Sequence, residues 1–300
     1  MTNPNVSVMM PCYNSKLTLA RAIASVILQS FEDWELVLVD DGSTDTPFEV
    51  VEAVADARIR YIRLERNRGR GFARQVALQQ CRGSFLCMLD ADDWMYPKRI
   101  EEEVEFLQRA QSVVVVSAGM AITRPSGQLT GIRSKGTGQI QGPFRSLHIP
   151  FAFPPSMIRM EAIGNARFDE TLKRGQDADF ILQVLRGRKF CVLDSVNYAY
   201  VEDERDAIVK SINSHPYVRA RYRKHIRDFP ALAPLAIVQS YFAESALRVG
   251  SRLNADGYLL DKRVKMPSMC EIELHREALR SVSELAERIM PSAFGSIGEW

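Results

Sequence analysis

The sequence has few cysteines, no long apolar run and almost no net charge. Its five cysteines, an odd number, are widely spaced and include no CxxC pair, which argues against a disulfide framework or a cysteine-based zinc site. The first residues, MTNPNVSVMMPCYN, lack the basic and apolar regions of a signal peptide, and no stretch approaches a membrane span. A net charge of +2 gives no reason to expect a nucleic-acid partner. These absences together predict a cytoplasmic protein with reduced thiols.

The first third of the sequence alternates short apolar runs with segments of helical periodicity. The runs at Val6–Met10, Leu36–Val39, Ile59–Leu64 and Ser84–Leu89 predict strands, and the helix-periodic segments lie at 16–29, 73–80 and 98–109. Leu36–Val39 is apolar on both faces, as expected for a parallel strand covered by helices. The alternation predicts an α/β fold with a doubly wound, mostly parallel sheet and helices on both faces.

The remainder of the chain changes character twice. VVVVSAGMAITRPSGQLTGI predicts two strands around a turn, and Gly131–Phe153 is rich in Gly, Pro and Ser, which predicts an exposed, mobile loop. A helix is expected at about Asp177–Arg186, followed by two strands at Phe190–Leu193 and Asn197–Tyr200. From Tyr217 onward the pattern is mainly helical.

Two of the predicted strands end in clusters of carboxylates. LVLVDDGSTD places Asp40 and Asp41 at one strand end, and FLCMLDADD places Asp90 and Asp92 at another. A single cluster of this kind is equally well explained as turn and cap residues. Two clusters at the carboxyl ends of neighbouring strands would repel each other unless a cation or hydrogen-bond donors were present. The pattern therefore favours a ligand that brings a divalent cation, held with a diphosphate by Asp90 and Asp92, and donors for Asp41.

Five motifs in order carry a resemblance to a known family. They are VSVMMPCYN, WELVLVDDGSTD, NRGRGFAR, GSFLCMLDADDWMYP and FDETLKRGQDADF, and they extend over about 180 residues. In this order the chain resembles the inverting glycosyltransferases of family 2, which have the GT-A fold. The resemblance implies a glycosyltransferase domain over 1–215, with a nucleotide-sugar-binding half at 1–111, an acceptor half at 112–215 and a helical extension at 216–300. It fades after Tyr200.

The resemblance also implies roles for individual residues on the donor side. Pro11, Tyr13 and Asn14 match the turn that contacts the nucleotide base, although Tyr13 could instead be a half-buried core aromatic. Asp41 matches the base-binding aspartate, with Asp40 as a second candidate. Further nucleotide-sugar contacts are assigned to Arg74, Asp90 and Ala91, although Arg74 could equally be a solvated helix residue. Asp92 matches the direct ligand of a divalent metal, Mn²⁺ or Mg²⁺, and Asp93 is a neighbour of that ligand or a helix cap.

On the acceptor side the resemblance implies a carboxylate that acts as general base. Transfer with inversion is a single displacement, so the proton of the acceptor hydroxyl must be removed as the new bond forms. Asp177 in RGQDADF stands at this position and is preferred to Asp179, although the family often has Glu-Asp where this chain has Gln176-Asp177. Many members also carry a late histidine ligand, whereas here YVEDERDAIVKS has none before His215. Metal binding is therefore expected to depend on Asp92 and the diphosphate.

The implied reaction uses a nucleoside-diphosphate sugar, preferably UDP-linked, and a saccharide or lipid-linked acceptor in bacterial surface polysaccharide synthesis. The alternative is a non-catalytic relative that binds nucleotide sugars. A sugar-1-phosphate nucleotidyltransferase is disfavoured because MMPCYNSK has no glycine. For the C-terminal region, basic residues at 219–227 followed by an apolar segment suggest peripheral docking at the inner face of the membrane. Helices packed on the catalytic domain or on a second subunit, as a homodimer, are the favoured reading.

Overall fold

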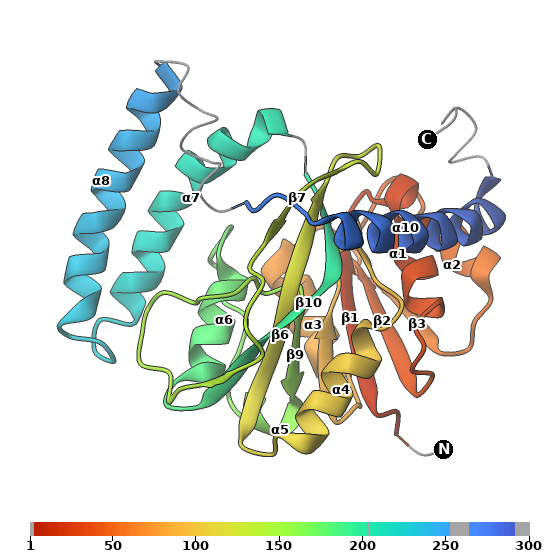
Figure 1. The fold of residues 1–300 in the computed structure, drawn as a ribbon, viewed down its shortest axis with the longest axis horizontal. Helices are drawn as coiled ribbons and strands as arrows, with labels where there is room; N and C mark the ends of the chain where they lie inside the picture. The colour runs from red at the N-terminus through yellow and green to blue at the C-terminus, as the bar shows by residue number, and fades with distance from the viewer. Residues whose placement is uncertain (1–2, 203, 253–263, 292–300) are drawn as a thin grey trace.

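The computed structural model describes residues 3–202, 204–252 and 264–291. Their centre is one mixed sheet in the order β3-β2-β1-β4-β9-β6-β10-β5, with β7 paired to β6 and β8 paired to β10 (Figure 1). The strands are β1 (Val6–Cys12), β2 (Trp34–Asp40), β3 (Ile59–Arg63), β4 (Phe85–Met88), β5 (Trp94–Met95), β6 (Val113–Thr123), β7 (Leu129–Arg133), β8 (Ile140–Gln141), β9 (Ser156–Arg159) and β10 (Lys189–Val201).

The first four strands form the parallel half of the sheet. β1 lies between β2 and β4 and pairs with both in parallel, and the register places Cys12 opposite Asp40 at the carboxyl end. All residues of β1, β2 and β4 are buried because helices cover both faces, as their continuous apolar sequences predicted. The loops that follow these three strands therefore meet at one edge of the sheet.

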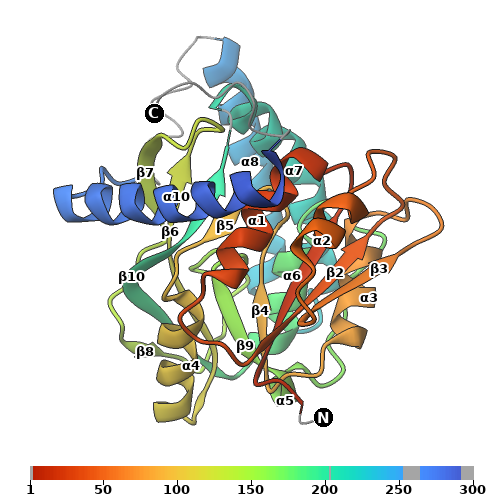
Figure 2. The ribbon, with the colours of Figure 1, turned by 90° about the vertical axis from the view of Figure 1, so that its right-hand side faces the viewer.

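Helices cover the two faces of the sheet in separate groups (Figures 1 and 2). One face carries α1 (Lys16–Ile27), α2 (Phe48–Val54), α4 (Arg99–Arg109) and α10 (Met269–Ile289). The other face carries α3 (Arg70–Gln80), α5 (Met160–Ile163), α6 (Gln176–Leu185) and part of α7 (Glu204–Lys224). Alternate residues of β1 enter the two cores: Val8 and Met10 pack on the α1 side and Met9 packs on the α3 side. The predicted α/β fold with helices on both faces is confirmed.

Two predictions about the second half of the chain were wrong in detail. The two strands expected at 190–193 and 197–200 are one strand, β10, whose pairing with β6 shifts register between Val192 and Tyr198. The segment 131–153 was expected to be exposed, but its aromatic and aliphatic side chains enter the core: Phe144, Leu147, Phe151 and Phe153 are each at least nine-tenths buried. The Gly, Pro and Ser residues between these apolar side chains made the segment look like an exposed loop in the sequence.

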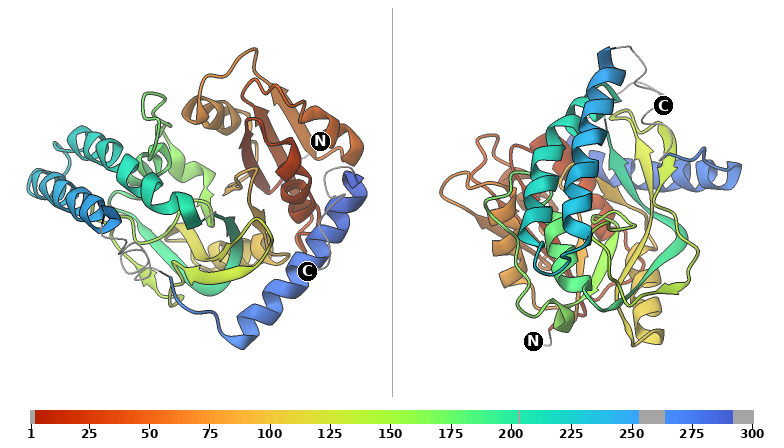
Figure 3. Two further views of the ribbon diagram at one scale, coloured as in Figure 1. Left: turned by 90° about the horizontal axis from the view of Figure 1, so that it is seen from above. Right: turned by 90° about the vertical axis from the view of Figure 1, so that its left-hand side faces the viewer.

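The C-terminal helices lie on opposite sides of the molecule (Figure 3). α7 packs beside α8 (Leu232–Arg252), whereas α10 runs across α1. The ring of His275 in α10 is buried between the Tyr96 hydroxyl and the Gly127 carbonyl, at 2.7 and 2.9 Å. Residue 215 falls inside α7, so the expected boundary at 215/216 lies within a helix. Within the described ranges, no helix is long and apolar enough to cross a membrane.

Candidate functional site

A cavity of about 310 Å³ opens at the carboxyl ends of β1, β2 and β4. This is the edge at which ligands bind in open parallel sheets. Six of the residues predicted from the sequence line it: Pro11, Tyr13, Asp41, Asp90, Ala91 and Asp92. Tyr13 is 47% exposed and is therefore not a core aromatic. Parallel pairing alone brings these residues together from three loops separated in sequence.

Asp41 holds the loop that forms one wall of this cavity. Its two carboxylate oxygens accept hydrogen bonds from the backbone N–H groups of Arg68 and Gly69, each at 2.8 Å. The same loop passes so close to Gly42 that a Cβ there would lie 2.5 Å from the Arg66 carbonyl carbon, and Gly42 also has a φ of +72°. The Asp-Gly step is therefore required both for the turn after β2 and for the approach of the next loop.

Asp40 and Asn14 are among the predicted residues that do not line this cavity. Asp40 is fully buried and accepts hydrogen bonds from the Ser43 backbone N–H at 2.8 Å and the Tyr61 hydroxyl at 2.5 Å. Asn14 accepts a hydrogen bond from the Thr44 backbone N–H at 2.9 Å, which ties the turn after β1 to the turn after β2. In this structure both residues shape the loops beside the cavity.

Arg74 is paired with Asp90 beneath the cavity. Its Nη2 donates to Asp90 Oδ1 at 2.9 Å, and the Arg74 side chain is only 2% exposed, so it is not an ordinary solvated helix residue. Burial alone would raise the pKa of Asp90, but the positive charges of Arg74 and Arg70 outweigh it and hold that pKa below its usual value. Asp90 is therefore a carboxylate at neutral pH, fixed in direction by α3.

The two aspartates that follow Asp90 have opposite surroundings. Asp92 is exposed at the cavity, where its oxygens are accessible to a ligand. Asp93 is buried and accepts hydrogen bonds from the Tyr198 hydroxyl at 2.7 Å and the Val201 backbone N–H at 2.8 Å. Burial, together with the charges of Asp92 and Asp90, raises the pKa of Asp93 well above its usual value. Asp93 thus fastens the loop to β10, whereas Asp90 and Asp92 line the cavity.

The carboxylates of Asp90 and Asp92 suit a hard divalent cation, which prefers oxygen ligands. Among the described residues, however, no three His, Cys, Asp or Glu side chains are grouped so that they could hold a metal by themselves. The residues fit a cation whose remaining ligands come from a bound diphosphate and water.

A second cavity, of about 390 Å³, adjoins the first and shares Arg70 and Asp90 with it. It is lined by Asp177 from the first turn of α6, by the aromatic side chains of Phe151, Phe153 and Tyr200, and by three further arginines, Arg74, Arg133 and Arg221. Two compartments therefore meet at the end of β4, one with the strand-end carboxylates and one with Asp177.

Arg70 is the residue of the site that sequence reasoning missed. It begins α3, lines both cavities and has its guanidinium pKa raised mainly by Asp90, with contributions from Asp92 and Asp177. Arg70 lies within NRGRGFAR, between Gly69 and Gly71, and its position depends on the path of the loop held by Asp41. The available signal was its place at a helix N-terminus between two motif residues.

Comparison with known proteins places the chain in a family. The family model "Glycosyl transferase family 2" matches residues 7–165. The chain is 34% identical over 149 residues to the putative glycosyltransferase EpsE of Bacillus subtilis, covering 45% of this chain and 54% of that protein. It is 31% identical over 212 residues to the succinoglycan biosynthesis protein ExoO of Rhizobium meliloti, covering 66% and 60%. The chain thus spans little more than half the length of these relatives.

Solved structures share the fold at lower identity. S. aureus TarS 1-349 aligns with 95% of this chain and 82% of its own, at a TM-score of 0.60 and 21% identity. The mannosyltransferase PcManGT from Pyrobaculum calidifontis, in complex with GDP-Man and Mn²⁺, aligns with 97% and 89% at a TM-score of 0.59 and 17% identity. With the family model covering the strands and loops that build the first cavity, the chain belongs to glycosyl transferase family 2.

Proposed function

We propose that the chain is an inverting glycosyltransferase of polysaccharide biosynthesis. It moves a sugar from a UDP-linked donor to a hydroxyl of a saccharide or lipid-linked saccharide. The observation that carries the proposal is the junction of the two cavities: carboxylates suited to a metal-bound diphosphate lie on one side, and Asp177 lies on the other. A transferred sugar at this junction would have the diphosphate on one side and the acceptor hydroxyl on the other.

The donor occupies the cavity at the ends of β1, β2 and β4. Tyr13 offers an exposed ring for stacking on the base, beside Pro11, and Asp41 has oxygen lone pairs left after its two backbone hydrogen bonds. The TarS structure has been solved with UDP and with UDP-GlcNAc, which supports a nucleotide-linked donor for this fold. A relative from Escherichia coli, 37% identical over 103 residues, is named as a UDP-Glc-dependent glucosyltransferase acting on a diphosphoundecaprenol-linked sugar.

The metal ligand on the protein is Asp92, with Asp90 beside it and directed toward the sugar and ribose. A divalent metal here would neutralise charge that develops on the departing diphosphate. Arg70 lies where it can stabilise the same charge from the side of α3. Because Arg74 fixes Asp90, the carboxylate keeps its direction when the donor is absent.

Asp177 acts on the acceptor as general base. One of its oxygens takes the proton of the acceptor hydroxyl while that hydroxyl oxygen attacks the anomeric carbon. The bond from that carbon to the diphosphate oxygen breaks in the same step, and the electron pair leaves with the nucleoside diphosphate. The configuration at the carbon is inverted because attack and departure occur on opposite faces.

A non-catalytic nucleotide-sugar-binding relative is the alternative. The presence of both Asp92 and Asp177 at joined cavities favours the enzyme. The test is a panel of nucleotide sugars with Mn²⁺, measuring protection against thermal unfolding and release of nucleoside diphosphate. Protection by UDP-sugars together with release supports the enzyme, and protection without release for any sugar or acceptor would support the alternative.

The proposed location is the cytoplasm, with α7 and α8 packed on the rest of the chain or on a second subunit, as a homodimer. Approach of these helices to the inner face of the membrane is the competing arrangement. Co-sedimentation with anionic vesicles and the molar mass in solution distinguish the two.

A further inference from the structure

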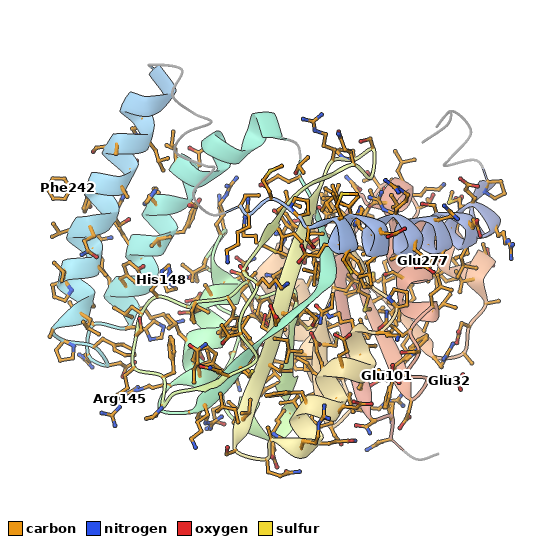
Figure 4. The ribbon with its side chains drawn as sticks, viewed as in Figure 1. Glu32, Glu101, Arg145, His148, Phe242 and Glu277 are labelled. Atoms are coloured by element: carbon orange, nitrogen blue, oxygen red, sulfur yellow. The ribbon has the colours of Figure 1, made fainter. Side chains whose placement is uncertain are left out.

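A third cavity of about 580 Å³ lies between α7, α8 and residues 146–148. It shares two side chains, His148 and Arg221, with the cavity that holds Asp177, and none of the described residues that line it is an Asp or Glu. In Figure 4, His148 lies beside α7, while Phe242 projects from α8 into solvent. A ligand could therefore extend from Asp177, past Arg221 and His148, into the groove between the two helices.

Arg221 has an unusual position for an arginine. Its side chain is 8% exposed, and its Nε is buried without a hydrogen-bond partner in the part of the chain that the structure describes. An unpaired buried charge is costly because it loses its hydration without gaining a counterion. The Nε atoms of Arg74 and Arg133 are also buried without a partner among the described residues, but Arg74 pairs with Asp90 and Arg133 pairs with Glu202. Among the described residues no carboxylate pairs with Arg221, whose guanidinium lies 5.2 Å from the centre of the Tyr222 ring, so an anionic ligand can supply the counterion.

The groove beyond Arg221 is lined by apolar side chains interleaved with the polar side chains of Ser146, Ser214, His215, Gln239 and Ser240. Leu147, Val218, Tyr222 and Ala236 line it, and Leu232 and Leu235 of α8 also line it although they are 44% and 56% exposed. The sequence from 229 to 243, FPALAPLAIVQSYFA, contains no charged residue, so no ion pair competes for this surface. An apolar chain would cover side chains that are otherwise in contact with water.

We propose that this groove binds the phosphate-linked apolar chain of a lipid-linked acceptor. Arg221 and His148 donate hydrogen bonds to the phosphate, the chain lies between α7 and α8, and the saccharide lies in the adjoining cavity beside Asp177. This inference rests on the proposed function and chooses among its acceptors. The anion at Arg221 is better explained by a phosphodiester than by the carboxylate of a free saccharide. Only the phosphodiester connects the sugar beside Asp177 to an apolar chain in the groove.

Calorimetric titration with dodecyl phosphate, below the concentration at which it forms micelles, tests the proposal. Inorganic phosphate serves as the probe without an alkyl chain, and dodecyl maltoside serves as the alkyl probe without a charge. Dodecyl phosphate should bind more tightly than either probe. Arg221→Gln should weaken dodecyl phosphate binding about 10- to 100-fold, the range expected for a hydrogen bond to a charged group, and leave dodecyl maltoside unchanged. The matched control is Arg223→Gln, because Arg223 is exposed on the same helix and lines neither cavity.

Two results would overturn the proposal. Inorganic phosphate that binds as tightly as dodecyl phosphate would show that the groove contributes nothing, and equal losses in Arg221→Gln and Arg223→Gln would show non-specific charge attraction. If Arg221→Gln does not fold, two separate variants, Arg221→Lys and Leu235→Ser, replace it. Leu235→Ser must then weaken the binding of dodecyl phosphate and leave the binding of inorganic phosphate unchanged. This titration requires no donor and no turnover, so a failure of glycosyl transfer leaves its result intact. Conversely, transfer to a neutral alkyl glycoside without dodecyl phosphate binding would reject the inference and keep the proposed function.

Discussion

Asp177 and Asp179 are two residues apart in the first turn of α6, yet only Asp177 lines the cavity that adjoins the strand-end carboxylates. Asp179 is fully buried, where it accepts hydrogen bonds from Lys224 and from His225, each at 2.8 Å. The hydrogen bonds from His225 and Lys224, together with the charge of Lys224, outweigh the effect of burial and hold the pKa of Asp179 below its usual value. Asp179 thus joins α6 to the end of α7, and Asp177 faces the cavity that we propose for the acceptor.

Asp177→Asn should leave donor binding almost intact and lower transfer by about 10²- to 10⁴-fold, the usual cost of losing a general base. The amide keeps the size of the side chain but cannot take the proton. The transfer rate and the UDP-sugar affinity are measured for Asp177→Asn and for Asp179→Asn. Asp179→Asn should instead lower the melting temperature of the protein. If Asp179→Asn loses transfer and Asp177→Asn does not, the choice of Asp177 as the base is wrong. If neither variant loses transfer, the whole acceptor-side assignment is wrong.

Asp92→Asn should remove the metal dependence of UDP binding. Asp92 is exposed at the donor cavity, and the described residues offer no grouped set of three ligands to replace it. Calorimetry with UDP, with and without Mn²⁺, measures the effect. The wild-type protein should bind more tightly with the metal and the variant should bind equally in both conditions. An unchanged metal dependence in the variant would contradict the assignment of Asp92.

Arg70→Gln should lower kcat/KM for the donor about 10- to 100-fold, as expected when a charged hydrogen-bond donor to a diphosphate is lost. Arg70 lines both cavities and interacts electrostatically with Asp90, Asp92 and Asp177. Arg68→Gln is the matched control, because the Arg68 guanidinium lies over the Phe72 ring, 3.4 Å from its centroid, and lines neither cavity. Equal effects of the two substitutions would indicate general charge attraction.

Glu103 should make the folded state less stable as the pH rises from about 4.5 to about 7. Burial raises the pKa of this carboxyl to about 7, and its Oε2 has no hydrogen-bond partner among the described residues. Between the ordinary value and 7 the folded state binds more protons than the unfolded state, so stability falls with rising pH. Urea unfolding at pH 5 and pH 7 should show a smaller difference for Glu103→Gln than for the wild type. Glu105→Gln, an exposed position on the same helix, should behave as the wild type.

The donor side could be predicted because its residues follow strands. Once Leu36–Val39 and Phe85–Met88 are assigned to one parallel sheet, Asp41 and Asp90 must come together whatever the rest of the chain does. Local sequence could not decide which of Asp40 and Asp41 enters the core. Successive side chains of a strand point to opposite faces, so the answer depends on where the strand ends. The structure resolves it through Tyr61, whose hydroxyl binds Asp40.

The acceptor side was less accessible from the sequence. Its cavity combines Arg133 after a turn, His148 in an irregular segment and Arg221 in a helix, and no local period connects positions so far apart. Phe153 packs against Phe180 of α6, on the face of the sheet that also carries α3, and Phe151 packs against Phe190 of β10. Long-range packing, which leaves no signal in a short window, determines this half.

The pairing of β5 with β10 bears on how such enzymes can be recombined. Met95 and Trp94 hydrogen-bond in register with Tyr198 and Ala199, so residues on either side of position 111 share one ladder. A chimera cut at 111/112 would have to rebuild that ladder with a foreign strand. α8, in contrast, contacts the protein chiefly through α7. Exchange of the α7–α8 hairpin between homologues is therefore the graft that the architecture tolerates best, and it would carry a new groove to an unchanged sheet.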